Sequence, residues 1–141
     1  MSELRIHTDG GARGNPGPAA AGIVFSMGDW THGFGKCIGD TTNNVAEYSA
    51  VIEALLAIPE IIAQQGNISS LHFYLDSQLV VRQILGEYRV KEAGLQKLHA
   101  HVLELLRGLS LSYSFSHIPR SENAEADKLV NKALDEQRSN S

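Results

Sequence analysis

The sequence contains a single cysteine, Cys37, and no apolar run close to the length of a membrane-spanning helix. One cysteine cannot form an internal disulfide, and the sequence has no paired cysteine and histidine pattern of the kind that binds zinc. A membrane-spanning helix needs about 20 consecutive apolar residues, so none is expected. Residues 1–3 show no basic region followed by an apolar stretch, so we expect no signal peptide and a cytoplasmic protein without a membrane partner.

The sequence also lacks an excess of basic residues. Its formal net charge is −4, which argues against a protein that holds nucleic acid by bulk positive charge. The charge is unevenly distributed, because residues 82–107 carry five basic and three acidic side chains and the rest of the chain has a net charge of −6. This basic segment is explained equally well by a solvated helix face and by part of a nucleic-acid site.

A length of 141 residues with 43% hydrophobic residues suits one globular domain. We place this domain at residues 1–137 and a frayed tail at 138–141. Apolar periodicity and turn signals predict strands at 4–7, 19–27, 30–37, 71–75 and 109–115, and helices at 44–58, 77–85, 93–106 and 122–137. Pro59 interrupts the apolar pattern of the first helix, and Ile61 and Ile62 can add another helical turn before residues 64–67 end it. Three strands in a meander followed by strand–helix units indicate an α/β domain with a mixed sheet.

Two aspartates follow predicted strands. Asp9 lies at the start of a glycine- and proline-rich loop over residues 8–18, and Asp76 comes directly after the strand at 71–75. Ligands gather at the carboxyl ends of parallel strands, so the two carboxylates are expected to face each other. Each also has a simpler explanation, because Asp9 suits a tight turn and Asp76 suits the N-cap of the next helix.

Two further carboxylates lie on apolar helix faces. Glu47 shares a face with Ala50, Val51 and Ala54, where burial of a charge is costly unless the charge is paired or bound to a metal. The helix dipole stabilises a carboxylate near the start of the helix by about 1 kcal/mol, which is less than the several kcal/mol that burial of an ion costs. Asp127 shares a face with Val130 and Leu134 of the last helix. A partly exposed position at the edge of that apolar face would explain an aspartate there equally well.

Four carboxylates without cysteine or clustered histidine favour hard cations, and Mg²⁺ or Mn²⁺ fits best. Two such ions about 3.5–4 Å apart can activate water and stabilise the leaving oxygen of a phosphodiester. The pattern therefore suggests metal-dependent phosphodiester hydrolysis.

The sequence resembles a type 1 ribonuclease H over residues 4–134. The resemblance rests on four motifs in the same order: TDGG with RGNPG at residues 8–17, TNNVAEY at 42–48, DSQLV at 76–80, and NAEADKL at 123–129. It implies a ribonuclease H-like α/β fold, in which a three-strand antiparallel meander and two parallel strands form a five-stranded mixed sheet flanked by helices.

The resemblance also implies endonucleolytic hydrolysis of the RNA strand of an RNA–DNA hybrid. Two metal ions would act in this reaction, which leaves 3′-hydroxyl and 5′-phosphate ends. The catalytic metal ligands would be Asp9, Glu47, Asp76 and Asp127. His117 matches a mobile histidine that assists proton transfer or product release, although a loop histidine is more often simply exposed. An imidazole side chain suits a general acid or base near neutral pH.

The same resemblance implies a set of substrate-binding residues. Asn15, Asn44 and Gln78 match contacts to the RNA strand, where small polar side chains can read 2′-hydroxyl groups in the minor groove. Thr42 and Asn43 match a pocket for a DNA-strand phosphate, which is compatible with capping of the helix that follows. Gly10 and Asn123 complete the set.

The sequence departs from many family members after the helix at 77–85, because their basic helix and loop are missing. Tyr88, Arg89 and Lys91 remain there, so fewer phosphates would be neutralised and hybrid binding would be weaker. This compact form resembles archaeal-type members, some of which also cut double-stranded RNA, and we expect a monomer. There are two alternatives to this function. One is a hybrid-binding module without catalysis, and the other is a nuclease of the same fold that acts on DNA junctions.

Overall fold

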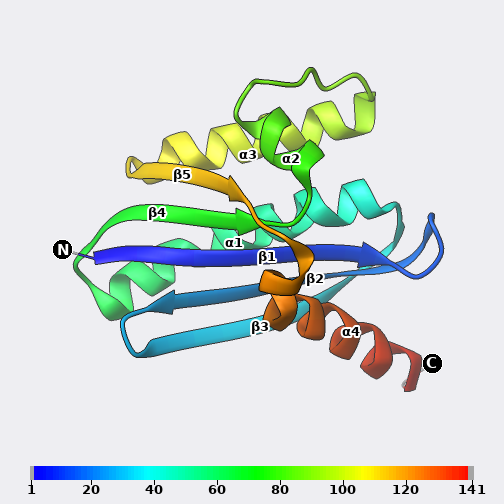
Figure 1. Ribbon diagram of the computed structural model, residues 1–141, viewed down its shortest axis with the longest axis horizontal. Helices are drawn as coiled ribbons and strands as arrows, with labels where there is room; N and C mark the ends of the chain where they lie inside the picture. Colours follow the sequence, from blue (N-terminus) through cyan, green and yellow to red (C-terminus); the bar gives the residue numbers. More distant parts are fainter. Residues whose placement is uncertain (1, 140–141) are drawn as a thin grey trace.

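One mixed sheet of five strands runs through the described part of the chain, in the order β3-β2-β1-β4-β5 (Figure 1). The structure is a computed structural model that describes residues 2–139. The strands are β1 (Ser2–Ala12), β2 (Gly17–Met27), β3 (Trp30–Thr41), β4 (Ile68–Leu75) and β5 (Ser112–His117). The first three strands pair antiparallel, and β4 and β5 run parallel to β1. The predicted fold, a meander with two added parallel strands, is confirmed.

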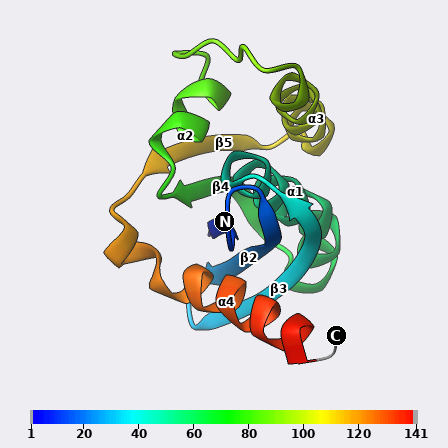
Figure 2. The same cartoon turned by 90° about the vertical axis from the view of Figure 1, so that its right-hand side faces the viewer.

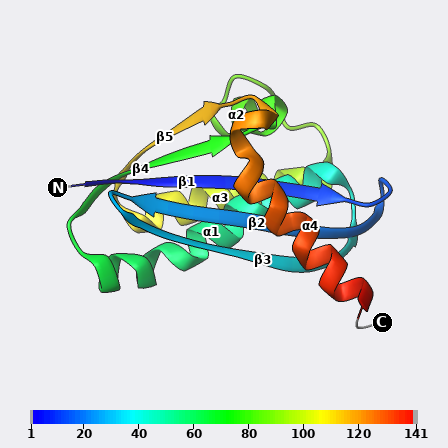
Figure 3. The same cartoon turned by 60° about the horizontal axis from the view of Figure 1, so that its bottom comes forward.

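The helices cover both faces of this sheet. They are α1 (Asn43–Gln65), α2 (Gln78–Ile84), α3 (Ala93–Leu109) and α4 (Ala124–Ser139), with a short 3₁₀ turn at Arg120–Asn123. Figure 2 looks along the strands and shows α1 and α4 on opposite sides of the sheet. Figure 3 shows α4 lying across β2 and β3. No helix within residues 2–139 has both the length and the apolar character needed to cross a membrane.

The main core lies between the sheet and α1, and α3 packs against α1. Phe25, Leu55 and Phe73 are fully or almost fully buried there. The layer under α4 is smaller and is built from Ala20 of the sheet with Val130, Ala133 and Leu134 of α4. Gly22 belongs to this layer, since a Cβ on it would lie 2.2 Å from the Ala126 carbonyl oxygen. Small residues in the sheet therefore allow α4 to approach closely, which brings its first turn near β1.

The glycine-rich segment is mostly strand rather than loop. β1 continues through Asp9, Gly10 and Gly11 to Ala12, and β2 already begins at Gly17. The prediction that Asp9 ends its strand is therefore wrong by three residues. The physical reason is that these residues pair in register with the small residues of β2, for example Gly10 with Ala21. The turn that remains is the short hairpin at residues 13–16.

Pro59 does not interrupt α1, contrary to the predicted helix end at residue 58, whereas the further turn expected at Ile61 and Ile62 is present as part of the same helix. The helix begins after Thr42 and continues to Gln65. A proline in a helix interior costs about 3 kcal/mol. Ile58 and Ile61 on either side of it are buried, and each contributes about 1.5–3 kcal/mol by burial. Tertiary burial thus outweighs the local preference.

The C-terminal boundaries also differ from the prediction. α3 extends to Leu109, and β5 covers Ser112–His117, so His117 ends a strand instead of lying in a loop. Residues 120–123 form the 3₁₀ turn, which replaces the predicted helix start capped by Ser121. α4 reaches Ser139, so two positions of the expected frayed tail are helical, and residues 140–141 lie outside the described residues.

Candidate active site

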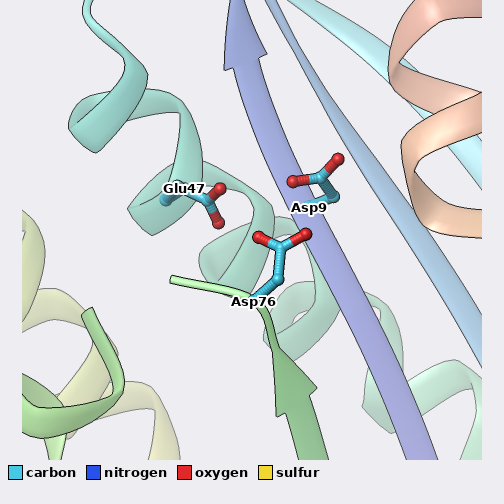
Figure 4. Close-up of side chains that lie close together, drawn as sticks. All are labelled: Asp9, Glu47 and Asp76. Carbon is cyan, nitrogen blue, oxygen red and sulfur yellow. The ribbon is translucent and has the colours of Figure 1, made fainter. Parts of the chain in front are cut away.

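Three of the predicted carboxylates come together at one point. Asp9 comes from the middle of β1, Glu47 from the second turn of α1, and Asp76 from the residue after β4. Each offers a carboxylate oxygen within 4.8 Å of the other two, and Figure 4 shows the three side chains pointing toward one another. The parallel pairing of β1 with β4 aligns Thr8 with Leu75. The residues that follow this pair, Asp9 and Asp76, are therefore neighbours.

Burial makes this cluster electrostatically costly. Burial, the Asp76 carboxylate and to a smaller extent the Asp127 carboxylate raise the pKa of Asp9 to about 7. Burial, together with Asp9 and Asp76, raises the pKa of Glu47 well above its ordinary value, and the Gly10 N–H only partly offsets this. Because like charges in a buried site oppose ionisation, the cluster needs a bound proton or a cation near neutral pH.

Glu47 is the strongest indication that the site suits a cation. It is 8% exposed, and its Oε2 atom is buried without a hydrogen-bond partner. A buried carboxylate oxygen in this position is costly unless a cation binds it. The donor set contains only hard oxygen atoms, which matches the preference of Mg²⁺ and Mn²⁺. The residues present therefore fit a divalent cation.

Asp76 is free to join the cluster because the next residue caps the helix. The Ser77 hydroxyl accepts a hydrogen bond from the Val80 N–H at 3.3 Å and serves as the N-cap of α2. Asn123 holds Asp76 from behind, since its side-chain amide donates to the Thr8 carbonyl at 2.8 Å and lies 3.4 Å from Asp76 Oδ2. Asn123 is 1% exposed, so it links Thr8 of β1 to Asp76, the residue after β4, from within the core.

Asp127 lies beside the cluster rather than inside it. It is in the first turn of α4 and half-buried, and it lines the same cavity as the other three carboxylates. Its Oδ1 atom is 3.7 Å from the guanidinium of Arg120, which is largely exposed. The cavity has a volume of about 460 Å³, which leaves room for cations and part of a substrate.

Three polar residues of this cavity were not predicted from the sequence. Arg13, Arg120 and Asn131 line it together with the carboxylates. Asn131 could have been found from its position, because it lies one helical turn after Asp127 on the same face. Arg13 belongs to the RGNPG motif, but no pattern in the sequence assigns either arginine to the cavity, since their placement depends on how the hairpin and the 3₁₀ turn fold over it.

The predicted DNA-phosphate pocket lies at the start of α1. The Thr42 hydroxyl accepts from the Val45 N–H at 3.3 Å and caps the helix. Asn43 accepts from the Ala12 N–H and donates its own N–H to Asn15 Oδ1, both at 2.9 Å. Asn15 and Asn43, which lie 28 residues apart, are therefore in contact.

The remaining predicted residues lie around the cluster. A Cβ on Gly10 would lie 2.2 Å from the Ala46 carbonyl, so glycine allows α1 to approach β1. His117 is exposed and pairs across the sheet with Leu75, the residue before Asp76. Gln78 lies beside Arg82. Its side-chain oxygen accepts hydrogen bonds from Arg82 Nε at 3.1 Å and Arg82 Nη2 at 3.2 Å.

Asn44 belongs to a second cavity, which we call the α2–α3 hollow. This hollow has a volume of about 560 Å³ and lies between α2, the start of α3 and the loop that joins them. It is lined by Asn44, Leu79, Gln83, Glu87, Tyr88, Arg89, Lys91, Glu92 and Leu95. Arg89 and Lys91, which remain where many other family members carry a basic helix and loop, thus border a partly apolar surface next to the start of α1.

Comparison with known proteins identifies the family. Residues 7–133 match the family described as reverse transcriptase-like. The chain is 41% identical over 137 residues to ribonuclease HI of Halobacterium salinarum, covering 94% of this chain and 65% of that protein. It is 32% identical to ribonuclease H of Clostridium botulinum, covering 96% of this chain and 98% of that protein. It also matches the bifunctional protein Rv2228c of Mycobacterium tuberculosis at 36% identity, over 92% of this chain and 35% of that protein.

Solved structures agree with these relatives. The structure of LC11-RNase H1 in complex with an RNA/DNA hybrid has a TM-score of 0.88 and 42% identity, and covers 95% of this chain and 98% of that one. The RNase H1 of Halobacterium salinarum has a TM-score of 0.86 and 38% identity over 95% and 98% of the two chains. The chain spans about two thirds of the Halobacterium sequence relative and about a third of Rv2228c. On the sequence match, the fold and the acidic cluster together, the chain belongs to the type 1 ribonuclease H family of nucleases.

Proposed function

We propose that this protein hydrolyses the RNA strand of RNA–DNA hybrids in a reaction that depends on divalent cations. The observation that carries the proposal is the cluster of Asp9, Glu47 and Asp76, in which one buried Glu47 oxygen lacks a partner. A relative 42% identical in sequence has been solved with an RNA/DNA hybrid. The alternative of a structural module without catalysis is disfavoured, because such a module would have no need for buried acidic residues at this cost.

The proposed reaction is a phosphodiester hydrolysis. Water adds to phosphorus, the bond to the 3′-oxygen breaks, and the products carry a 5′-phosphate and a 3′-hydroxyl. Two Mg²⁺ or Mn²⁺ ions in the site would supply activation of water and stabilisation of the leaving oxygen. Asp9, Glu47 and Asp76 would hold them, with Asp127 as the fourth ligand from α4. The fixed strand and helix positions keep these oxygens in place without further ordering.

Other residues would bind the substrate and move protons. His117, exposed at the end of β5, would accept or deliver a proton or assist product release. Asn15, Asn44 and Gln78 would read the 2′-hydroxyls of the RNA strand. Thr42 and Asn43 would hold a phosphate of the DNA strand, Gly10 would line the site beside Asp9, and Asn123 would keep Asp76 in place. We expect the protein to act as a monomer in the cytoplasm.

Cleavage of a labelled hybrid tests the proposal. The wild-type protein should cut the RNA strand with Mg²⁺ or Mn²⁺ and should be inactive with a chelator. The Asp9→Asn variant should be inactive under both conditions. Binding of the hybrid without any cation-dependent cleavage would contradict the enzymatic function and favour a binding module. Faster cleavage of an all-DNA junction would favour a DNA nuclease. Cleavage of double-stranded RNA in the same assay would extend the substrate range, as in some compact relatives.

A further inference from the structure

The short hairpin between β1 and β2 is attached to the rest of the molecule on two sides. On one side, Asn15 and Asn43 tie it to the start of α1 through two hydrogen bonds of 2.9 Å. On the other side, the Arg13 guanidinium forms an ion pair with Asp135 at 2.8 Å. The Arg13 N–H also donates to the Pro18 carbonyl at 2.8 Å and closes the hairpin.

The second attachment reaches the helix that carries Asp127. Arg13 Nη2 lies 3.4 Å from Asn131 Oδ1 and 3.5 Å from the Asn131 carbonyl oxygen. The Asn131 amide in turn donates to the Asp127 carbonyl at 3.1 Å. Residues 127, 131 and 135 recur at intervals of four, so they form one stripe along α4. Arg13 therefore spans from the hairpin to the face of α4 that borders the acidic cavity.

We propose that Arg13 and Asp135 form a clamp that positions the hairpin, and with it Asn15, for binding of the hybrid. Arg13 is a positioning residue in this proposal, because it acts through Asn15 instead of touching the reacting atoms. The proposal rests on the proposed function for its substrate. Loss of the clamp allows the hairpin to move away from the start of α1, which weakens substrate binding and leaves the carboxylate cluster unchanged.

The variant Asp135→Asn separates the clamp from direct substrate binding by Arg13. It removes the ion pair and leaves Arg13 in place. If Arg13 is part of a clamp, KM for the hybrid should rise about threefold, in line with the strength of an exposed ion pair, with kcat unchanged. If Arg13 binds a substrate phosphate directly, release from Asp135 should leave KM unchanged or lower it, and that result would overturn the proposal.

A charge reversal and a matched control complete the test. The double variant Arg13→Asp with Asp135→Arg restores the ion pair and should recover most of the loss in KM seen with Arg13→Asp alone. Failure of the reversal to recover KM would also overturn the proposal. Lys36→Gln breaks another exposed ion pair, that of Lys36 with Glu53 at 3.2 Å, which lies outside the residues lining the cavity. Its KM should stay at the wild-type value.

Hydrogen exchange provides a measurement that does not depend on activity. The Ala12 N–H donates to Asn43, and the Asn43 N–H donates to Asn15. Both N–H groups should exchange about threefold faster in metal-free Asp135→Asn than in wild type. Unchanged exchange rates would overturn the clamp even if the protein cleaves hybrids. Faster exchange in Asp135→Asn, combined with a wild type that does not cleave hybrids, would instead refute the proposed function and leave the clamp intact.

Discussion

The acidic cavity and the α2–α3 hollow meet at the first turn of α1, where Asn43 lines the cavity and Asn44 lines the hollow. The cavity is built by β1, α1, α4 and the residue after β4. Its Asp9 and Glu47 carboxylates are buried, and Asp76 and Asp127 are half-buried. The hollow is built largely by a loop, and its Tyr88, Arg89 and Lys91 are mostly exposed. The two regions thus differ in how firmly their side chains are held.

This difference indicates a division of tasks. Buried charges on rigid elements cost stability but hold oxygen atoms at fixed positions, as a metal site requires. Exposed basic groups on a loop cost little and attract phosphates, although salt screens them. We therefore expect changes in the cavity to affect turnover strongly and changes in the hollow to affect substrate affinity weakly.

The largest expected effect comes from Glu47→Gln. Loss of a cation ligand should reduce kcat by about a thousandfold or more, as is typical when the main source of transition-state stabilisation is removed. The free energy of unfolding should stay the same or rise, because the change removes a buried charge. Cleavage assays and urea denaturation without metal measure the two effects.

A matched control for this variant is Glu53→Gln. Glu53 also lies on α1, and its carboxylate forms an ion pair with Lys36. It should keep nearly full activity. A large loss of stability in metal-free Glu47→Gln would mean that Glu47 has a structural role, and would contradict the distinction drawn between the two regions.

The second prediction concerns stability and pH in the absence of metal. The folded pKa of Asp9, about 7, lies above its ordinary value of 3.8, so the folded state retains a proton that the unfolded chain releases. The stability that the folded protein gains from this retained proton is complete below about pH 4 and is lost as the pH rises toward 7. Between pH 5 and 7 this loss should amount to about 2 kcal/mol.

Denaturant unfolding with a chelator measures this loss, and Asp9→Asn is the reference. The comparison is needed because burial lowers the pKa of His7 below 6.5, which gives a stability change of the opposite sign. The wild type should lose more stability with rising pH than Asp9→Asn does. Equal pH profiles for the two proteins would contradict the electrostatic description of the cavity.

His117→Ala should have a moderate effect. If His117 carries a proton or assists product release, kcat should fall about tenfold without loss of all activity, at the lower end of general acid–base effects. Steady-state kinetics on a hybrid measures this change. The control is His101→Ala, since His101 is also exposed but lies on α3. An unchanged rate in His117→Ala would remove this histidine from the mechanism.

The smallest effect is expected in the hollow. The double variant Arg89→Gln with Lys91→Gln should raise KM about threefold at moderate salt and leave kcat unchanged. It should also reduce the slope of log affinity against log salt by about one unit for each phosphate that is no longer neutralised. Lys97→Gln, an exposed basic residue outside the hollow, is the control. A large decrease in kcat would show that the two regions do not divide the tasks as proposed.

Much of this fold could be predicted because its patterns are local. The strands of the meander and the apolar face of α1 follow from periodicity. Each of the four motifs supplies one carboxylate to the lining of the same cavity. The errors are also local in origin. Intrinsic preference predicts a break at Pro59 and a loop at the glycines of β1, and in both cases packing against the rest of the molecule outweighs that preference.

From the sequence alone, the carboxylates proposed to carry the chemistry could be predicted, because their four motifs resemble those of type 1 ribonucleases H and because a charge on the apolar face of α1 is costly without a cation. Only the tertiary structure decided how they combine. The parallel pairing of β1 with β4 brings Asp9 beside Asp76, and Gly10 lets α1 approach so that Glu47 joins them. The contacts of Arg13 and Asn123 likewise join segments more than 100 residues apart, and no local pattern encodes such contacts.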